Sequence, residues 1–425
     1  MTLASKNIAV IGTGPAGLMA ASVLLKKGLN VSVFERRPSP GRKLLIAGSS
    51  GLNITHAAEP PAFIDHYRVR GGRSNEHAQL QRQCLEKALS TFTVKDWLGF
   101  IQELGHETYL GTSRRYFLKE MKSSQFLKSW TTALEEQGAK FVLDTPILDF
   151  EVDPKSGKII LHRGYLIAAT TASLCGPVAA AATYDAVLFA LGGASYEDEA
   201  LQWPHMFTKK QIGFTPFAAT NTGFALDLPT AFFAEAEGLP LKNIVFTSAE
   251  GSMRGDCVFT KYGIEGTPIY TFGCVGVAHL DLKPDWSVEH ILERLQGVKE
   301  NLSPIRRVKK TLNLGDAALA LLFHSNGTKN QSDLAWWADR IKAWPIALTA
   351  PRPLSEAISS DGGVQLEELD LTSYPFMLKR FPGVFLAGEM LDWDAPTGGF
   401  WIQGCVSQGA TAANGVVKFL EQAKN

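Results

Sequence analysis

The sequence has no excess of charge of either sign, because its 42 Lys and Arg residues match its 42 Asp and Glu residues. Binding to a nucleic acid or to an anionic membrane needs a clustered positive surface, and a balanced composition supplies no overall field toward such partners. We therefore expect neither a nucleic-acid partner nor a membrane partner. A local basic patch is compatible with this composition, and the oligomeric state is left open.

Cysteine is scarce, with five residues that are far apart and include no Cys-x-x-Cys pair. This spacing argues against a disulfide framework and a zinc site, so we expect no metal. It also argues against an enzyme that exchanges electrons through two neighbouring thiols. Reduced, isolated cysteines are typical of cytoplasmic proteins.

Long apolar runs are absent. Residues 1–7 are too short and polar for a signal peptide, and the alanine-rich stretch 166–191 is interrupted by Gly176, Pro177 and Asp185. A membrane-spanning helix needs about 18 consecutive apolar residues. The sequence therefore predicts a soluble cytoplasmic protein.

A glycine-rich turn follows the first buried-strand pattern. Residues 8–11 read Ile-Ala-Val-Ile, and Gly12-Thr13-Gly14-Pro15-Ala16-Gly17 comes directly after them. Residues 16–27 have the pattern of a helix that ends at Gly28, and residues 31–34 predict a second strand. This strand, turn, helix and strand indicate a βαβ unit.

The positions of the glycines indicate a dinucleotide site. Gly12 permits a sharp turn, Gly14 lets the backbone approach a pyrophosphate, and Gly17 lets the helix pack close to the strand. The phosphates then lie at the helix N-terminus, where unpaired N–H groups face them. Glu35, at the end of the second strand, is placed to accept hydrogen bonds from ribose hydroxyls.

The type of secondary structure that the sequence predicts changes along the chain. From about residue 214 short β-rich runs continue to about residue 281, and a helical stretch follows over 287–344. Residues 383–388 then return to the strand-to-glycine pattern of the N-terminus. We predict a discontinuous domain formed by residues 1–205 and 350–425, with an inserted β-rich domain at 206–349 whose helical part covers about 285–345.

Two stretches point to FAD as the dinucleotide. A basic turn and a glycine-rich loop occupy residues 36–53, where an NAD-binding domain normally continues into another helix. Near the C-terminus, residues 385–389 read Phe-Leu-Ala-Gly-Glu, and Thr397-Gly398-Gly399-Phe400 then opens a helix. A helix N-terminus aimed at a flavin stabilises negative charge on the reduced ring.

On these motifs the chain resembles the HI0933-like family of bacterial flavoproteins, which are described as NAD(P)/FAD-dependent oxidoreductases. The resemblance implies an α/β fold, with a discontinuous Rossmann-type FAD-binding domain of the glutathione-reductase type, an inserted β-barrel-like domain and a small helical subdomain. It rests on the glycine loop and on residues 41–43, 113–117, 191–195, 261–266, 387–392 and 397–399.

The chain departs from the family in one loop. Residues 48–53 read Gly-Ser-Ser-Gly-Leu-Asn, where many members have three glycines followed by Arg-Cys-Asn. The asparagine is kept, and the arginine and cysteine are missing. Chemistry that depends on those two side chains is therefore not expected.

The resemblance also implies the residues around the cofactor. Those expected at the ADP half are Gly12, Gly14, Pro15, Ala16, Gly17 and Glu35, with the backbone near Ile147 at the adenine. Those expected along the pyrophosphate and flavin are Arg36, Lys43, Ala47 and Asn53. Those expected around the ribityl and ring portions are Gly192, Gly193, Gly388, Glu389, Gly398, Gly399, Phe400 and Gln403.

The predicted function is that of an FAD-dependent oxidoreductase, which transfers hydride between the flavin and a small organic substrate. Reduction of an activated C=C bond, or its reverse, fits this chemistry. The candidates for a proton donor or a substrate contact are His56, Arg115, Tyr116 and Tyr262. No second G-x-G-x-x-G follows a strand, so NAD(P)H is expected to act, if at all, as a transient donor at the flavin.

Two alternatives remain open. One is a flavin-containing RNA-modifying protein, which the neutral charge balance disfavours. The other is a non-catalytic flavin redox sensor, which would keep the pyrophosphate loop without a substrate cavity.

Overall fold

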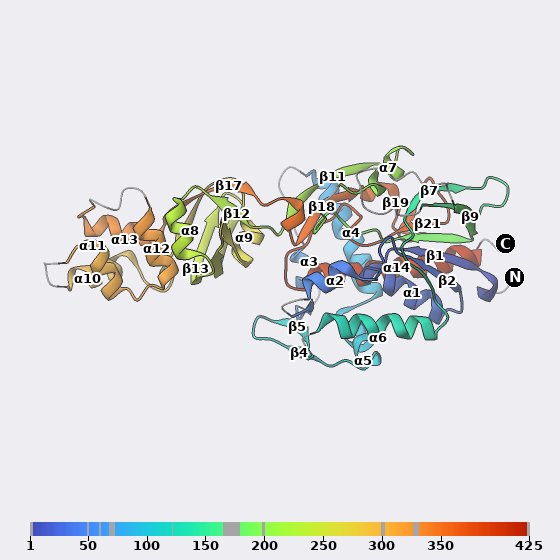
Figure 1. Ribbon diagram of the computed structural model, residues 1–425, viewed down its shortest axis with the longest axis horizontal. Coiled ribbons are helices and arrows are strands. Elements are labelled where there is room, and N and C mark those ends of the chain that lie inside the picture. The colour runs from blue at the N-terminus through green and yellow to red at the C-terminus, as the bar shows by residue number, and fades with distance from the viewer. Residues whose placement is uncertain are drawn as a thin grey trace. The chain divides into compact units, whose positions relative to one another are not determined.

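The computed structural model describes residues 3–48, 51–58, 61–67, 73–120, 122–164, 179–197, 200–298, 302–325 and 331–422. Half of the alanine-rich stretch 166–191, residues 166–178, lies outside these residues. The chain divides into two compact units, Met1–Ala218 with Ser360–Asn425, and Ala219–Ser359 (Figure 1). Among the described residues no helix combines the length and the apolar character that crossing a bilayer requires.

The division between the two units falls later in the sequence than the predicted boundaries at 205/206 and 349/350. Helix α7 (Trp203–Thr208) belongs to the first unit, because the ring of Phe207 packs edge-on against Phe189 at 5.5 Å between centroids. Strand β17 (Trp344–Pro351) belongs to the second unit, where Ala350 pairs with Ala225. Composition alone did not show these long-range partners, and the division by contacts falls at 218/219 and 359/360.

A seven-stranded sheet forms the centre of the first unit. Its order is β19-β20-β21-β10-β1-β2-β6, and the strands from β21 to β6 are parallel. The strands are β1 (Asn7–Ile11), β2 (Asn30–Phe34), β6 (Lys140–Val142), β10 (Ala186–Phe189), β19 (Leu369–Asp370), β20 (Met377–Leu378) and β21 (Val384–Leu386). Because β2 and β10 lie on opposite sides of β1, the strand order reverses at β1, and ligands bind at such reversals in open α/β sheets.

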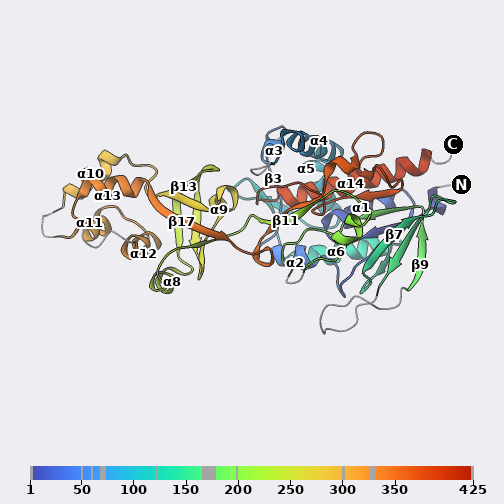
Figure 2. The ribbon, with the colours of Figure 1, turned by 90° about the horizontal axis from the view of Figure 1, so that it is seen from above.

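Helices cover this sheet. The apolar β10 is fully buried, as expected for a strand covered on both faces. In Figures 1 and 2, α14 (red) runs beside α1 (blue). The helices of the unit are α1 (Pro15–Lys26), α2 (Arg42–Ala47), α3 (Ala62–Asp65), α4 (Asn75–Thr91), α5 (Val94–Glu103), α6 (Ser123–Glu136), α7 and α14 (Phe400–Gln422), with short 3-10 helices at Leu3–Ser5 and Leu366–Glu368.

Smaller sheets complete the first unit. One contains β3 (Asn53–His56), β5 (Arg115–Leu118) and β4 (Thr108–Leu110) in that order. Another contains β7 (Ile147–Val152), β8 (Ile159–Arg163) and β9 (Ala179–Tyr184). The division between the units falls within β11 (Phe214–Thr220) and at the start of β18 (Ser359–Val364), which form a two-stranded sheet.

The second unit is built on a closed barrel of six strands in the order β12-β15-β14-β13-β16-β17. The barrel strands are β12 (Phe224–Leu226), β13 (Pro240–Ser248), β14 (Gly251–Phe259), β15 (Gly263–Glu265), β16 (Gly276–Asp281) and β17. Phe246, Phe259 and Leu280 are fully buried in its core. Closure leaves no open sheet edge among these strands.

Helices accompany the barrel. They are α8 (Thr230–Ala236), α9 (Thr267–Phe272), α10 (Val288–Gln296), α11 (Pro304–Thr311), α12 (Asp316–His324) and α13 (Leu334–Lys342), with a 3-10 helix at Leu354–Glu356. Within this unit the helices α10 to α13 gather on one side of the barrel strands (Figure 2). Trp337 is fully buried and its ring stacks on Trp344 at 6.2 Å. The predicted fold class, a Rossmann-type domain with an inserted barrel and a helical part, is confirmed.

Candidate functional site

The glycine turn lies between β1 and α1, at the point where the strand order reverses. Gly12 has a φ of +106°, and a Cβ added there would lie 2.2 Å from the carbonyl oxygen of Ala190. A Cβ on Gly17 would lie 2.0 Å from the carbonyl oxygen of Gly12. Gly14 differs, since a Cβ there would meet no heavy atom within 4 Å. Gly12 and Gly17 are therefore required by packing, and Gly14 faces open space.

The N-terminus of α1 has no capping side chain. Gly14 is its N-cap residue and Pro15 begins the helix, so no side chain accepts from the first N–H groups. These groups and the positive end of the helix dipole form a site suited to a phosphate. The open space at Gly14 lets the backbone come close to such a ligand.

Glu35 closes the other side of this turn. Its Oε2 accepts hydrogen bonds from the backbone and the hydroxyl of Thr13, and its Oε1 accepts from the backbone N–H of Arg37 at 3.0 Å. The Thr13 hydroxyl in turn accepts from the N–H of Gly41 at 3.0 Å. Thr13 is a site residue that sequence reasoning missed, and its position in the glycine motif was the available signal.

A second cluster surrounds Glu389, which follows β21 after Ala387 and Gly388. Its carboxylate accepts from Lys43 Nζ at 3.1 Å, and from the backbone N–H groups of Gly193 and Ser360 at 3.1 and 3.2 Å. Ser195 donates its hydroxyl to the same carboxylate at 3.2 Å. Glu389 is thus held in place at the carboxyl ends of the parallel strands and is not a solvated loop acid.

Helix α14 joins the glycine turn to a third region. Gly409 packs against Ala16 so closely that a Cβ would lie 2.2 Å from the Ala16 carbonyl oxygen. Gly388, the residue before Glu389, packs against the Ala16 side chain as well. From Gly409 the helix runs nine residues back to its start at Phe400, a distance of roughly 14 Å at 1.5 Å per residue.

Gly398 and Gly399 precede α14, with φ values of +112° and +94°. A Cβ on Gly399 would lie 2.6 Å from the backbone of Thr55, so the start of α14 rests directly on β3. Among the described residues, three buried side-chain oxygens near this contact have no hydrogen-bond partner. They are Asn53 Oδ1 and Thr55 Oγ1 on β3, and Gln403 Oε1 in the first turn of α14. Buried acceptors without donors suit a ligand that brings N–H or O–H groups.

His56 lies at the same place. Its ring stacks on Phe400 at 5.0 Å between centroids, and the ring of His66 lies 5.5 Å away. Burial, followed by the positive charges of His66, Arg114 and Arg115, lowers the pKa of His56 to about 4. Its Nδ1 accepts from the N–H of Ala58 at 3.0 Å, so the neutral ring carries its proton on Nε2.

Arg115 faces His56 across the β3–β5 pair, in register. Its Nε would lie 3.1 Å from a Cβ on Gly398. Burial lowers the pKa of Arg115. Tyr116, the next residue, pairs with Thr55 and Leu110 and packs against the core. Asn53, His56, Arg115 and Phe400 therefore come together around the start of α14.

Other predicted residues lie elsewhere. Tyr262 belongs to the second unit, where its hydroxyl bonds to Glu265 and the Arg352 guanidinium lies 4.1 Å from its ring centroid. Ala47 is exposed at the end of α2. Arg36 is 44% exposed and pairs with Glu197 at 2.7 Å.

The remaining predicted residues lie near the glycine turn and Glu389. Ile147 begins β7, two residues after Thr145, whose N–H donates to the Glu35 carbonyl. Gly192 and Gly193 follow β10, and the Gly193 carbonyl accepts from Lys43 Nζ at 2.7 Å.

Two charged clusters were missed by sequence reasoning. Glu197 accepts from Arg36 and Arg37 at 2.7 Å each, and Arg42 lies 3.6 Å away. Asp392, only 1% exposed, receives a bidentate contact from Arg73 at 2.7 and 2.8 Å. Burial raises the pKa of Asp392. Arg73 and Asp392 are 319 positions apart, so no local pattern pointed to their contact.

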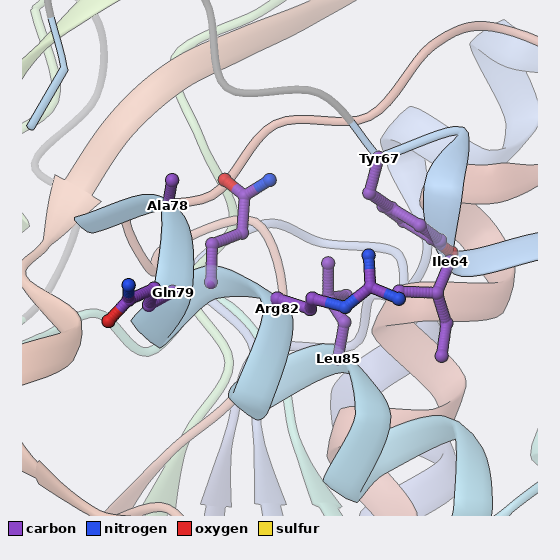
Figure 3. A pocket seen from close by; sticks show the side chains of 7 residues that line it. Ile64, Tyr67, Ala78, Gln79, Arg82 and Leu85 are labelled. Carbon is purple, nitrogen blue, oxygen red and sulfur yellow. The ribbon is translucent and has the colours of Figure 1, made fainter. Parts of the chain in front are cut away.

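A cavity of about 290 Å³ lies beside α3 and α4, as Figure 3 shows. Its lining residues are Ile64, Tyr67, Ala78, Gln79, Gln81, Arg82 and Leu85. None of the predicted site residues lines it, although the Tyr67 hydroxyl donates to the Phe400 carbonyl at 2.8 Å. Tyr67 therefore connects the lining of this cavity to the first residue of α14.

The residues present fit an extended dinucleotide. The uncapped turn at Gly14 suits a pyrophosphate, and the unpartnered oxygens at the start of α14 suit a ring with N–H donors. The roughly 14 Å along α14 between these two places is longer than a pyrophosphate and fits a cofactor that continues through a ribityl chain. The fold is that of a Rossmann-type FAD-binding domain.

The chain belongs to the HI0933-like family. The model of the HI0933-like protein Rossmann domain matches residues 6–415, which confirms the resemblance drawn from the motifs. A ribosomal RNA dihydrouridine synthase of Haemophilus influenzae is 24% identical over 95% of this chain and 96% of its own length. A protein of the same description from Escherichia coli is 22% identical over 93% and 94%. Among solved structures, an open flavocytochrome c3 fumarate reductase covers 98% of this chain and 79% of its own, with 15% identity and a TM-score of 0.49.

Proposed function

We propose that the first unit binds FAD and that the protein is an oxidoreductase, which transfers hydride between the flavin and an organic substrate with an activated C=C bond. The observation that carries the proposal is the packing of Gly409 on Ala16. It fixes the uncapped glycine turn and the start of α14 on one rigid pair of helices. One cofactor can then contact both.

The glycine turn and its neighbours would hold the ADP half. N–H groups at the start of α1 would donate to the pyrophosphate, with Gly14 leaving the space for it. The Glu35 carboxylate, which already accepts from Thr13 and Arg37, keeps lone pairs for ribose hydroxyls. Lys43 and Glu389 would border the middle of the cofactor.

Residues at the start of α14 would surround the ring. The bound flavin supplies the hydride chemistry. His56 is neutral at physiological pH because its pKa is about 4, so it would offer a substrate an Nε2–H donor without a charge. Leu52 is 1% exposed in the apolar core and stands where many family members have cysteine, so no thiol takes part at this position.

A nicotinamide cofactor is the proposed electron donor. No second G-x-G-x-x-G follows a strand pattern in the sequence, and the one at residues 12–17 is already assigned to FAD. NADH or NADPH would therefore bind transiently beside the flavin.

The test is anaerobic reduction of the purified protein. We expect a yellow protein that releases FAD on denaturation and bleaches rapidly with NADH or NADPH in a stopped-flow mixer. A colourless protein that takes up no FAD contradicts the cofactor assignment. A yellow protein that neither donor reduces contradicts the nicotinamide step and favours a redox sensor or a substrate that reduces the flavin itself.

A uracil base in ribosomal RNA is a second candidate substrate. Both dihydrouridine synthase relatives match this chain over more than nine-tenths of its length. The C5=C6 bond of uracil is conjugated to a carbonyl and is therefore an activated double bond. Mass spectrometry of unmodified ribosomal RNA, treated with protein and NADPH, would reveal a gain of two hydrogens at uridine. No gain under conditions where the flavin is reduced would leave a small-molecule substrate.

A further inference from the structure

Arg115 is a shielded cation without a counter-ion. Among the described residues its guanidinium makes no ion pair and no hydrogen bond, although the side chain is partly buried and burial lowers its pKa. Two other partly buried arginines, Arg73 and Arg307, have several partners each. Arg73 bonds to two carboxylates, and Arg307 bonds to the carbonyls of Leu302, Leu295 and Val298. An unpaired charge in such a place is costly, and an anion held there would remove the cost.

The surroundings of Arg115 add positive potential. Its Nε lies next to Gly398, whose loop leads into the N-terminus of α14. That terminus carries the positive end of a helix of 23 residues. The strand partner of Arg115 is the neutral His56, and the preceding residue is the cationic Arg114. The guanidinium and the helix dipole therefore attract negative charge to the same place.

We propose that Arg115 stabilises the negative charge of the reduced flavin and so raises the reduction potential of the bound cofactor. This inference rests on the proposed function, in which the ring lies at the start of α14. A hydride brings two electrons and one proton from the donor, which leaves oxidised by two electrons, while the neutral flavin ring becomes an anion. A cation that makes no ion pair with the neutral oxidised ring, but does so with the anionic reduced ring, favours the reduced form.

Sulfite is a probe of this effect that needs no substrate. Its sulfur lone pair forms a bond to flavin N5, nothing leaves, and the adduct carries negative charge on the ring. A residue that stabilises the reduced flavin also tightens the sulfite adduct. Because no substrate is present, an effect on sulfite binding cannot come from a lost substrate contact.

The variants are Arg115→Met, Arg115→Lys and the matched control Arg114→Met. Arg114 is exposed and its Nη2 donates to the Ala57 carbonyl at 3.1 Å, so this control removes the same charge one residue away. We expect Arg115→Met to weaken sulfite binding about ten- to a hundredfold, the effect of losing a hydrogen bond to a charged group. The two-electron midpoint potential should fall by about 30 mV for each tenfold.

Arg114→Met should stay within about threefold of the wild type, and Arg115→Lys should lie between the wild type and Arg115→Met, since it keeps the charge without the planar fork. If Arg115→Met loses its flavin, Arg115→Lys carries the test through the same two measurements. Equal sulfite affinity and potential in the Arg115 variants and in Arg114→Met overturn the inference. A wild-type protein without FAD would instead overturn the proposed function.

Discussion

Substitution of Gly14 by valine separates cofactor binding from folding. Gly14 has φ −71° and ψ 175°, an extended conformation that any residue adopts, and a Cβ there meets no atom of the protein within 4 Å. Valine therefore fits the folded chain without a clash. The same side chain fills the space through which the backbone would approach a pyrophosphate.

The two effects have opposite signs. Replacing a flexible glycine where the backbone is compatible stabilises the apoprotein by about 0.4–1 kcal/mol. Losing one or two hydrogen bonds to a charged phosphate costs about 3 kcal/mol, which weakens FAD binding about a hundredfold. At an FAD concentration a hundred times the wild-type Kd, the ligand stabilises the wild type by about 2.7 kcal/mol and the variant by only about 0.4 kcal/mol.

Thermal unfolding with and without added FAD measures both effects in one experiment. We expect the wild type to gain Tm on addition of FAD, and Gly14→Val to unfold like or above the wild-type apoprotein with a small gain. Gly17→Ala is the contrasting variant, because its Cβ would lie 2.0 Å from the Gly12 carbonyl oxygen and should destabilise the apoprotein itself. A folded Gly14→Val protein that binds FAD with wild-type affinity would refute the assignment of this turn to the cofactor.

Two further predictions concern the charges of the first unit. Arg73→Ala should lower the free energy of unfolding, measured in urea, by about 2–3 kcal/mol, because it leaves Asp392 buried without its arginine partner. Solvent at the partly exposed Arg73 screens part of the loss. The exposed Arg82→Ala is the control, and equal effects of the two substitutions would contradict this prediction. The pKa of His56 is lowered to about 4, so the folded state favours its neutral form, and this contribution is complete above pH 6.5 and is lost as the pH falls toward 4. His56→Gln should reduce the loss of unfolding free energy between pH 7 and 4 by about 1–2 kcal/mol, after allowance for solvent screening. If the free energies of unfolding of the two proteins fall in parallel over this pH range, the prediction is wrong.

The glycine motif and the interrupted domain were readable from the sequence, because both depend on local patterns. A strand of four apolar residues, three spaced glycines and a helix of small residues predict the turn at Gly12 without knowledge of the rest of the chain. The change in texture near Phe214 indicated an insertion for the same reason. The barrel and helices of the second unit fulfil that expectation.

The local pattern of the sequence did not show the break between helices α4 and α5. In the sequence, apolar and polar residues keep helical spacing from residue 80 to 104, whereas α4 ends at Thr91 and α5 begins at Val94. Thr93 and Asp96 form a capping box that starts the second helix. Both helices keep an apolar face toward the core, so the periodicity alone did not show the break.

The surroundings of the start of α14 were decided by tertiary structure. The sequence singled out His56 and Arg115 as separate candidates, and only the pairing of β3 with β5 places them opposite each other beside Gly398. The same holds for Arg73 with Asp392 and for Tyr262, whose contacts lie in the other unit.

The physical reason is that local sequence patterns reflect short-range interactions, whereas the environment of a side chain depends on distant parts of the chain. A turn or a helix depends on dihedral preferences and on residues a few positions away, so the sequence by itself determined the glycine turn after β1 and the discontinuous domain. The environment of a charge depends on which distant strands become neighbours and how much water they exclude. Only the folded chain therefore decided that Asp392 is paired and that Arg115 is left without a partner among the described residues.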